Sequence, residues 1–345
     1  MKILVIRFKQ IGDSVLAAPI CNTLKNTFPD AQIDYVIYEH IGPLFENHKY
    51  IDNVITITKD EQKNIFKYIK KVWQVTRNNY DIIIDIMSTP KSELFTLLSP
   101  KCKYKIGRYK KNRGYTYTHK ILEPVGAKNK IDKFLKMLKP LEKEYDIKYT
   151  EDFSIEVTDQ EKEYMKNKMI DAGIDFQKPV LAFAINARVP SKVFNIEKML
   201  EVTKEIIKEF GPQIIFYYSP AEKEFALEAH KKLGKDKHIF TNIETKSIRE
   251  LAMLLKNCDM FFGNEGGPRH IAHAVGIPTL VVCRPNLDVK EWLIAGDKNE
   301  HIGPLDIDPN AYSLEASEQE KMMTIDLIVD KFRKFYNKNV KNSRI

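Results

Sequence analysis

Residues 259–278 read DMFFGNEGGPRHIAHAVGIP, and this stretch decides the fold class of the chain. An apolar run that is typical of a buried strand leads into two adjacent glycines and then into helical spacing from Pro268 onward. Gly266 and Gly267 permit a close approach of the backbone, and the free N–H groups at a helix start can bind a diphosphate. Many α/β turns carry glycines for geometry alone, so the pattern leaves both interpretations open.

The charged side chains after the two glycines also have two interpretations. Arg269 can supply a cation to a ligand, and His270 lies one turn inside the expected helix, where it can contact the same ligand. Alternatively, His270 is a polar residue that is satisfied on the flank of the helix, which is the role we expect for His273. The residue types alone do not separate these possibilities.

Short apolar runs alternate with amphipathic segments on both sides of this stretch. Continuous apolar strands separated by helices indicate parallel sheets covered on both faces. The charged, strand-poor region around 150–178 predicts the division between two such sheets, so we predict domains at 1–160 and 161–325 and a basic C-terminal helix or tail at 326–345. The expected strands are 2–6, 33–38, 54–57, 81–86, 180–185, 213–218, 259–263 and 278–283, and the expected helices are 60–78, 159–172, 195–210, 221–233 and 247–256.

The first strand ends in RFKQIGDSVLAAP, residues 7–19. A dinucleotide-binding turn would carry the pattern G-x-G-x-x-G, but only Gly12 is present, which argues against nicotinamide or flavin binding here. Asp13 precedes a helix that we expect to begin near Ser14, and the commonest use of Asp at such a position is to cap the helix. A carboxylate at the carboxyl edge of a first strand also lies where α/β sheets meet ligands, so Asp13 can instead act as a base.

A second cationic candidate lies in NARVPSKVFN, residues 186–195, directly after the strand that opens the second domain. Lys192 follows an expected loop and precedes an expected helix, a position from which a lysine can neutralise a phosphate. Most lysines, however, are solvated surface residues, and Lys192 fits that description as well.

The net charge of +8 is clustered rather than evenly spread over the 345 residues. No acidic residue lies between Leu94 and Leu122, and the chain after Asp330 is again purely basic. Such clusters attract polyanions, although a solvated loop and a frayed end explain them equally well. The cations of the first cluster are Lys101, Lys103, Lys105, Arg108, Lys110, Lys111 and Arg113.

The cysteines and the hydropathy of the sequence indicate the environment in which we expect the protein to work. The four cysteines are scattered and form neither a CxxC pair nor a cluster with histidine, which predicts no disulfide framework and no zinc site. No apolar run reaches about 18 residues, so no membrane span is predicted. We therefore expect a soluble, cytoplasmic protein.

Several blocks, in their order along the chain, resemble glycosyltransferase family 9, the heptosyltransferases that build the inner core of lipopolysaccharide. The resemblance covers most of the chain, and although each block is weak alone, the ordered set is fairly specific. The blocks are IRFKQIGDSVLAAPI (6–20), DIIIDIMSTPKSEL (81–94, with Lys91–Ser92 in the place of an Arg–Ser), KIGR (105–108), Lys192 with Phe194, SPAEKE (219–224) and residues 263–278.

The resemblance implies a GT-B architecture, in which two Rossmann-like, doubly wound α/β domains face each other across a cleft. It also implies an inverting transfer from a nucleotide sugar that requires no metal and no cofactor. Asp13 matches the catalytic carboxylate of the family and Lys192 its diphosphate-binding lysine. Glu222 matches an acidic residue near the nucleotide sugar, or Glu224 does if the alignment slips. The remaining donor-binding residues that we expect are Glu265, Gly266, Gly267 and His270.

The chain departs from the family at the turn before the last of these residues. The family often reads N-D-T/S-G-P-x-H, whereas this chain has Glu265 in place of the Asp and Gly266 in place of the hydroxyl residue. The second glycine, the proline and the histidine are retained, so we expect the turn to keep its fold. The longer carboxylate and the lost hydroxyl change what faces the donor sugar.

The resemblance and the charge pattern together give a functional hypothesis. We expect transfer of a heptose from ADP-heptose to a lipopolysaccharide or lipooligosaccharide core acceptor, with peripheral contact to the anionic inner face of the cytoplasmic membrane. The acid-free segment lies in the acceptor-binding half, and we expect the phosphorylated glycolipid to contact Lys91, Arg108, Lys110 and Arg113.

Three other functions remain open at this point. One is a sibling transferase that uses another nucleotide sugar, and another is a sugar epimerase of the GT-B fold. The third is a basic nucleic-acid-binding protein. The basic segment carries no motif that reads DNA or RNA, so we expect no nucleic-acid partner.

Overall fold

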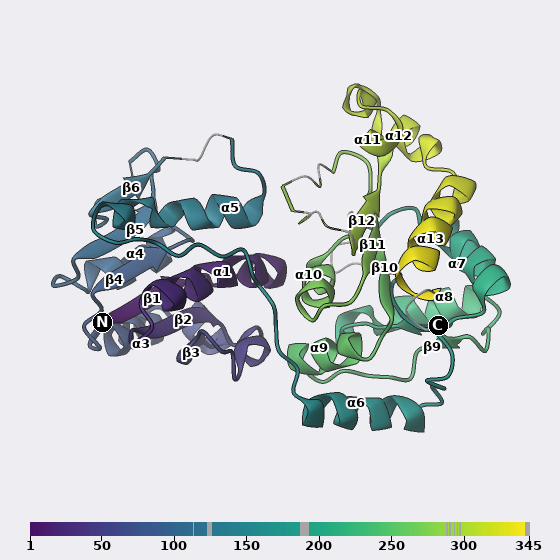
Figure 1. Ribbon diagram of the computed structural model, residues 1–345, viewed down its shortest axis with the longest axis horizontal. Helices are drawn as coiled ribbons and strands as arrows, with labels where there is room; N and C mark the ends of the chain where they lie inside the picture. The colour runs from purple at the N-terminus through teal and green to yellow at the C-terminus, as the bar shows by residue number, and fades with distance from the viewer. Residues whose placement is uncertain are drawn as a thin grey trace. The chain divides into compact units, whose positions relative to one another are not determined.

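The computed structural model describes residues 1–112, 114–122, 126–186, 193–287, 289, 291–292, 294, 296 and 298–341. The chain forms two compact units, residues 1–156 and residues 157–345. Each unit contains one six-stranded parallel sheet with helices on its faces (Figure 1). The predicted fold class, two doubly wound α/β sheets, is therefore confirmed.

The sheet of the first unit has the order β3–β2–β1–β4–β5–β6, and all neighbouring strands are parallel. The winding reverses between β1 and β4, where Ile6 and Asp85 are register partners. The carboxyl ends of these two strands therefore lie at the same level of the sheet. The strands are β1 (Lys2–Ile6), β2 (Gln32–Tyr38), β3 (Asn53–Ile57), β4 (Ile82–Asp85), β5 (Tyr104–Arg108) and β6 (His119–Ile121).

Helices α1 and α5 contact each other, and α3 packs with α2 and α4 (Figure 1). The helices of this unit are α1 (Ile11–Thr27), η1 (Gly42–Phe45), α2 (Lys59–Lys63), α3 (Ile65–Thr76), α4 (Pro90–Leu97), α5 (Lys130–Leu135) and η2 (Lys136–Lys143). The prediction of a single helix at 60–78 is wrong in one respect. It is broken at Asn64, whose side chain accepts hydrogen bonds from the N–H groups of Phe66 and Lys67 and so begins a new helix.

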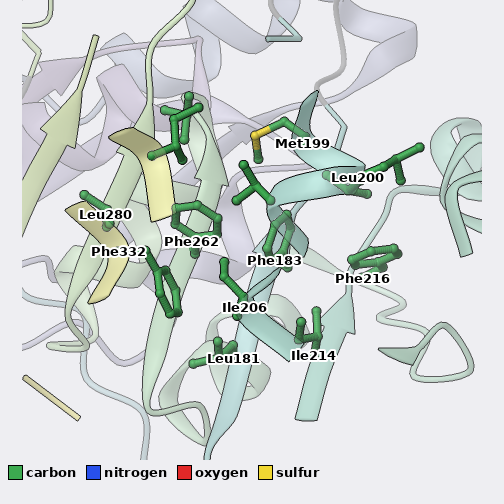
Figure 2. Packing of buried hydrophobic residues seen from close by; sticks show 14 of the residues in the cluster. Leu181, Phe183, Met199, Leu200, Ile206, Ile214, Phe216, Phe262, Leu280 and Phe332 are labelled. Atoms are coloured by element: carbon green, nitrogen blue, oxygen red, sulfur yellow. The ribbon is translucent and has the colours of Figure 1, made fainter. Parts of the chain in front are cut away.

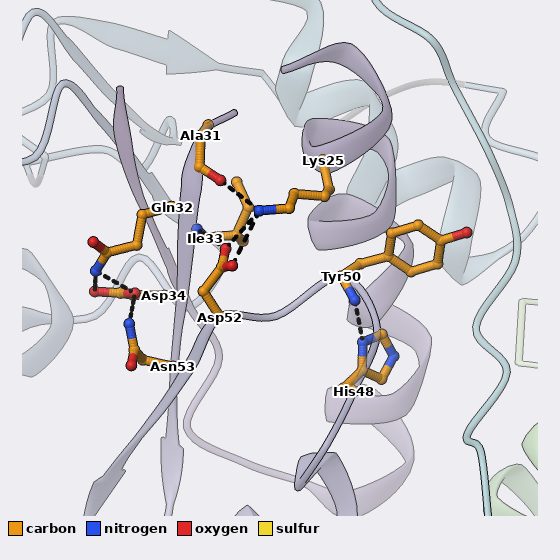
Figure 3. A network of polar contacts seen from close by, with 9 residues as sticks. All are labelled: Lys25, Ala31, Gln32, Ile33, Asp34, His48, Tyr50, Asp52 and Asn53. Atoms are coloured by element: carbon orange, nitrogen blue, oxygen red, sulfur yellow. Dashed lines mark hydrogen bonds and ion pairs between the residues drawn. The ribbon is translucent and has the colours of Figure 1, made fainter. Parts of the chain in front are cut away.

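A polar network closes the amino edge of this sheet (Figure 3). Asp52 accepts hydrogen bonds from the Ile33 N–H at 2.7 Å and from Lys25 Nζ at 2.9 Å. Asp34 accepts from the amides of Gln32 and Asn53 at 2.9 and 2.8 Å. Asp52 thus joins β2 to α1 and Asp34 joins β2 to β3, so this edge has a structural role.

The second unit repeats the architecture with the order β12–β11–β10–β7–β8–β9, again with parallel neighbours. The winding reverses between β7 and β10, where Ala184 and Gly263 are register partners. The strands are β7 (Val180–Ala184), β8 (Gln213–Phe216), β9 (Ile239–Phe240), β10 (Met260–Asn264), β11 (Thr279–Val282) and β12 (Asn299–Ile302).

A hydrophobic core lies between this sheet and helices α7, α8 and α13. Phe183, Phe216, Phe262 and Phe332 fill it, and Figure 2 shows their rings beside Ile206. The helices are α6 (Asp159–Asp171), α7 (Ile196–Phe210), η4 (Pro220–Glu222), α8 (Lys223–Lys232), α9 (Ile248–Lys256), α10 (Gly267–Ala274), α11 (Pro304–Ile307), η5 (Ala311–Ser313), α12 (Ala316–Met322) and α13 (Ile325–Asn339).

Helix α13 covers most of the segment expected as a basic helix or tail. Its apolar side chains, such as Phe332 and Phe335, are buried against the sheet, while Arg333 pairs with Glu209 of α7. The helix is thus part of the second core rather than an appendage. Over the described residues, none of the helices has the length and apolar character needed to cross a bilayer.

Candidate active site

Ligands of open α/β sheets bind at the carboxyl edge, where the winding reverses. In the first unit this point lies at the ends of β1 and β4. We call it the first edge, and it comprises Arg7, Asp13, Asp85, Ser88 and the residues that contact them. In the second unit it lies at the ends of β7 and β10, and we call it the second edge: residues 185–186 and 264–270. The candidate residues are considered edge by edge.

Asp13 lies in the first turn of α1, two residues after the helix begins at Ile11. Gln10 occupies the N-cap position, so the interpretation of Asp13 as the N-cap is wrong. Asp13 Oδ2 instead accepts a hydrogen bond from Arg7 Nη2, and the two side chains form an ion pair. Asp13 Oδ1 is buried and has no hydrogen-bond partner among the described residues. One carboxylate oxygen is therefore fixed while the other keeps its capacity to accept a proton.

Three cations surround one aromatic ring beside this carboxylate. The guanidinium of Arg7 lies 5.4 Å from the centroid of the Phe134 ring, that of Arg108 lies 5.8 Å away, and Lys130 Nζ lies 5.7 Å away. Phe134 and Lys130 belong to α5, which follows more than a hundred residues after β1. The sequence analysis missed Arg7, Lys130 and Phe134 as site residues. Such a cluster suits an anionic ligand, since cations over an aromatic face keep their charge available.

Of the expected acceptor residues, Arg108 and Lys110 lie at this edge. The Arg108 N–H donates to Ser88 Oγ at 2.8 Å, and Lys110 Nζ donates to the Ser88 carbonyl oxygen at 2.8 Å. Lys91, in the first turn of α4, instead donates to the carbonyl oxygen of Gln62 at 2.8 Å. Arg113 lies outside the described residues.

A buried network supports the loop that carries these cations. The hydroxyl of Tyr117 donates to Asp85 Oδ2 at 2.6 Å, and the Ser88 N–H donates to Asp85 Oδ1 at 2.9 Å. Burial raises the pKa of the Asp85 carboxyl. Gly107 is required here, because a Cβ at that position would lie 2.3 Å from the Tyr117 ring. Asp85 and Tyr117 position the edge and, being engaged, are not free to bind a ligand.

The second edge is held by Gly263 and Asn264 at the end of β10. The Asn264 amide donates to the carbonyl oxygens of Ala184 and Ile185 at 2.9 and 3.1 Å. Its Oδ1 accepts from the Phe194 N–H at 2.8 Å. Asn264 thus fixes both flanks of residues 187–192, which include Lys192 and lie outside the described residues.

Helix α10 begins at this edge as predicted, with Gly266 at its N-cap and Pro268 in its first turn. Gly266 has no side chain, so no side-chain acceptor caps the first N–H groups of the helix. The family's hydroxyl residue would stand at this N-cap. Its replacement by Gly266 therefore leaves the positive end of α10 open to a ligand anion.

Arg269 is a deeply buried cation of the second unit. Its side chain is 1% exposed, Nη2 donates to the Trp292 carbonyl oxygen at 2.8 Å, and Nε and Nη1 have no hydrogen-bond partner among the described residues. Burial lowers the pKa of the guanidinium, and the charge of Glu265 acts in the opposite direction. An arginine keeps its proton even so, which leaves a buried cation whose hydrogen-bonding capacity is mostly unused.

His270 is buried beside this cation. Burial, and next the charge of Arg269, hold the pKa of His270 well below its ordinary value. The ring is therefore neutral at pH 7, and its Nε2 lies 3.9 Å from Glu265 Oε1. A neutral imidazole offers one donor and one acceptor, which suits hydrogen bonding to a ligand better than charge pairing with a phosphate.

Glu222 lies after β8, at the same edge of the sheet. Its carboxylate accepts a hydrogen bond from the Ser219 N–H at 2.9 Å and closes a capping box around η4. This local contact alone explains an acidic residue at that position. Among the described residues, no group of three or more His, Cys, Asp or Glu side chains is arranged to hold a metal ion.

Comparison with known proteins identifies the family. The model of glycosyltransferase family 9 (heptosyltransferase) matches residues 69–295. The chain belongs to glycosyltransferase family 9. Lipopolysaccharide heptosyltransferase 1 of Campylobacter coli is 24% identical over 82% of the chain and 83% of the relative. Lipopolysaccharide heptosyltransferase 3 of Escherichia coli K12 is 25% identical over 78% of each.

Solved structures of this glycosyltransferase family have the same fold. A family 9 glycosyltransferase of Veillonella parvula superposes with a TM-score of 0.78 at 16% identity, covering 97% of this chain and 96% of that one. The E. coli heptosyltransferase WaaC with ADP gives a TM-score of 0.70 at 15% identity over 99% and 100%. The family 9 protein is thus a glycosyltransferase with the GT-B fold of the solved heptosyltransferases.

Proposed function

We propose that this glycosyltransferase moves a heptose from ADP-heptose to a lipopolysaccharide or lipooligosaccharide core acceptor, with inversion and without a metal. The named relatives are lipopolysaccharide heptosyltransferases, and a structural relative was solved with ADP. The observation that carries the proposal is Asp13, whose Oδ2 is fixed by Arg7 while its buried Oδ1 keeps an open acceptor position. The donor nucleotide, soluble in the cytoplasm, would place the reaction there.

Asp13 acts as the general base in this mechanism. The acceptor hydroxyl gives its proton to Asp13 as its oxygen bonds to the anomeric carbon. The bond from that carbon to the β-phosphate oxygen breaks, and its electron pair leaves with ADP. Attack from the face opposite the leaving group inverts the configuration. Because a carboxylate is a weak base, proton transfer is late and the sugar passes through an oxocarbenium-like state.

The second edge supplies the donor contacts. The uncapped start of α10 and the Arg269 guanidinium oppose the negative charge that grows on the leaving diphosphate. Lys192 would add a further cation at that diphosphate. Glu265 and the neutral His270, with Glu222 after β8, would bind hydroxyl groups of the donor.

The acceptor contacts belong to the first edge. A phosphate or carboxylate of the acceptor would bind among Arg7, Arg108 and Lys130 around Phe134, with Lys110 close by through Ser88. Lys91 and Arg113 would extend this surface. Because these contacts are electrostatic, acceptor binding should weaken as the ionic strength rises.

Donor identity is the decisive test. Equal concentrations of ADP, UDP and GDP are added in thermal unfolding experiments, and transfer from ADP-heptose to a truncated core acceptor is followed by mass spectrometry. ADP at about 100 times its Kd should stabilise the protein by about 2.7 kcal/mol, with smaller effects of UDP and GDP. Stabilisation by UDP alone would favour a sibling transferase with another donor, and loss of donor without a glycosylated acceptor would favour an epimerase.

Glu265 and Gly266 depart from the family pattern, and they are the specific reason to consider a sibling transferase that uses another donor. Restoring the family pattern with Glu265→Asp and Gly266→Thr tests it directly. If the donor is ADP-heptose in both forms, the double variant keeps transfer within about tenfold, since one hydrogen bond contributes about 1 kcal/mol. If the departures select another donor, the double variant gains ADP-heptose transfer that the natural chain lacks.

A further inference from the structure

Helix α3 is apolar on two sides, and the sheet covers only one of them. Tyr68, Val72 and Val75 are buried in the core of the first unit. On the adjacent side, the four large apolar side chains of Ile65, Phe66, Ile69 and Trp73 are 49%, 81%, 42% and 51% exposed. Residues 65, 69 and 73 are one turn apart and Phe66 adjoins them, so the four share one face.

Cations border this apolar face and acids are absent from it. No Asp or Glu occurs between Gln62 and Tyr80, whereas the segment contains Lys63, Lys67, Lys70, Lys71 and Arg77. Lys67 pairs with Asp60 at its edge, and the Arg77 guanidinium lies 4.7 Å from the Trp73 ring. Neither Lys63 nor Lys70 nor Lys71 forms an ion pair with a side chain in the described part of the chain. Lys67 and Lys71 lie on the far side of the helix, so we call Ile65, Phe66, Ile69, Trp73, Lys63, Lys70 and Arg77 the α3 face.

The basic segment at 94–122 is a weaker candidate for contact with a large anionic surface. Lys103 pairs with Glu144 at 2.7 Å, and Lys110 donates to the Ser88 carbonyl oxygen. Both cations are thus engaged within the first unit. Moreover, the segment contributes to the first edge, whereas the α3 face lies on a helix that takes no part in either edge.

We propose that the α3 face docks the enzyme on an anionic phospholipid bilayer, with the helix lying parallel to the membrane plane. The twelve residues of α3 span about 18 Å, enough for the four apolar side chains to enter the boundary between headgroups and acyl chains. Trp73 suits that boundary because its ring has an apolar body and a polar N–H. The lysines beside it meet the anionic headgroups.

Vesicle flotation with the full chain tests the proposal, and it needs no donor, so a failure of the proposed transfer reaction leaves it intact. The protein is mixed with vesicles of phosphatidylcholine alone or with about one third phosphatidylglycerol. We expect binding to the anionic vesicles that weakens with salt, and little binding to the neutral ones. In a Trp292→Phe background Trp73 is the sole tryptophan, and its emission should shift to the blue on binding.

Matched variants distinguish vesicle binding through the α3 face from nonspecific adsorption of the protein. Phe66→Ser, Ile69→Ser and Trp73→Ser together should reduce vesicle partitioning at least about tenfold, because each side chain loses its transfer from water. Lys70→Gln should reduce it about fivefold, whereas Lys71→Gln, on the far side of the helix, should change it less than about twofold. The control is Tyr164→Ser with Ile170→Ser, which removes two comparably exposed apolar side chains of α6 and should change partitioning less than about twofold. Circular dichroism confirms that each variant folds.

Two results would overturn the proposal. One is equal partitioning of the triple serine variant and the natural chain. The other is a shift of Trp73 emission that follows protein concentration without vesicles, together with a dimer in light scattering. That second outcome would mean that another copy of the chain covers the α3 face.

Discussion

The two edges differ in how far the guanidinium group of a buried arginine is paired within the protein. At the first edge Arg7 is paired with Asp13 inside the folded chain, and the two side chains are 12% and 9% exposed. At the second edge Arg269 is more deeply buried, and two of its three guanidinium nitrogens have no partner among the described residues. Only Nε of the first arginine lacks a partner among the described residues, whereas the second arginine has two such nitrogens and no paired carboxylate, which leaves them for a ligand.

This difference indicates which edge is built to receive negative charge. A buried cation without a counter-ion lowers the stability of the folded state, because desolvation is not offset. Such a cost is expected where a ligand restores the balance on binding. The leaving diphosphate of a nucleotide sugar is a ligand of that kind, and the uncapped start of α10 adds to the same attraction.

The largest expected effect concerns the first edge and catalysis. Asp13→Ala removes the proposed base and should lower turnover by about 10³-fold, within the range attributed to general base catalysis. Affinity for ADP should stay within about twofold, since the proposed nucleotide contacts belong to the second unit. Turnover is measured at saturating donor, and ADP binding by calorimetry. Asp30→Ala, at an exposed turn, is the control. Near-normal turnover in Asp13→Ala would refute the base assignment.

The next prediction compares the two arginines directly by substituting each with methionine. Arg7→Met leaves the buried Asp13 carboxylate unpaired and should lower the free energy of unfolding by about 3 kcal/mol. Arg269→Met removes an unbalanced charge and should leave that free energy unchanged or raise it by about 1 kcal/mol. The same variant should weaken ADP binding about tenfold, since one charge-assisted hydrogen bond contributes about 1.5 kcal/mol or more.

Urea unfolding of both variants gives the free energies, and titration with ADP gives the affinities. Equal destabilisation by the two substitutions would mean that Arg269 has partners of its own. In that case the contrast between the two edges disappears. Full ADP affinity in Arg269→Met would instead remove this arginine from the donor site.

A third prediction compares two glycines of the second edge. Gly263 has φ +123°, and a Cβ there would lie 2.5 Å from the Ala184 carbonyl oxygen, so Gly263→Ala should lower the free energy of unfolding by about 2 kcal/mol. Gly266 has extended backbone, and a Cβ would lie no closer than 3.7 Å to its nearest neighbour. Gly266→Ala is therefore the matched control and should change stability by less than about 0.5 kcal/mol.

These glycines also illustrate how far the sequence could be read. The strand before Gly263, the turn and the helix from Gly267 were all predicted, because apolar runs and adjacent glycines are local signals. The strands at Tyr104–Arg108 and Asn299–Ile302 were missed, since each is short and contains charged residues. Local periodicity is weak where a strand lies toward the edge of a sheet.

The positions of the candidate residues could be predicted where they lie in the turn after a strand or in the first turn of the helix that follows it. Asp13, Glu265 and His270 are of this kind. The cations around Phe134 were not recognised as a cluster, because α5 brings Phe134 and Lys130 to Arg7 from more than a hundred residues away. A contact at that separation leaves no periodic pattern in the sequence. The predicted roles of Lys192 and Arg113 stay predictions, since both residues lie outside the described part of the chain.

The last prediction is a pH dependence that arises from the buried histidines of the second edge. His270 and His273 are both on α10, and burial holds the pKa of His270 well below 6.5 and lowers that of His273 to about 4. The unfolded chain therefore binds more protons than the folded chain below pH 6.5. Stability is complete above pH 6.5 and falls by about 1.4 kcal/mol per pH unit for each neutral histidine as the pH decreases toward 4.

Unfolding free energies measured at pH 7, 6 and 5 give this slope, and His273→Gln separates the two histidines. The Asn299 amide donates to His273 Nε2 at 2.6 Å, a bond that requires this nitrogen to be unprotonated. The glutamine can accept the same bond and does not titrate, so the slope should fall by about 1.4 kcal/mol per pH unit. An unchanged slope would show that His273 is protonated in the fold. The named residues of the first edge include no histidine, so this dependence distinguishes the second edge from the first.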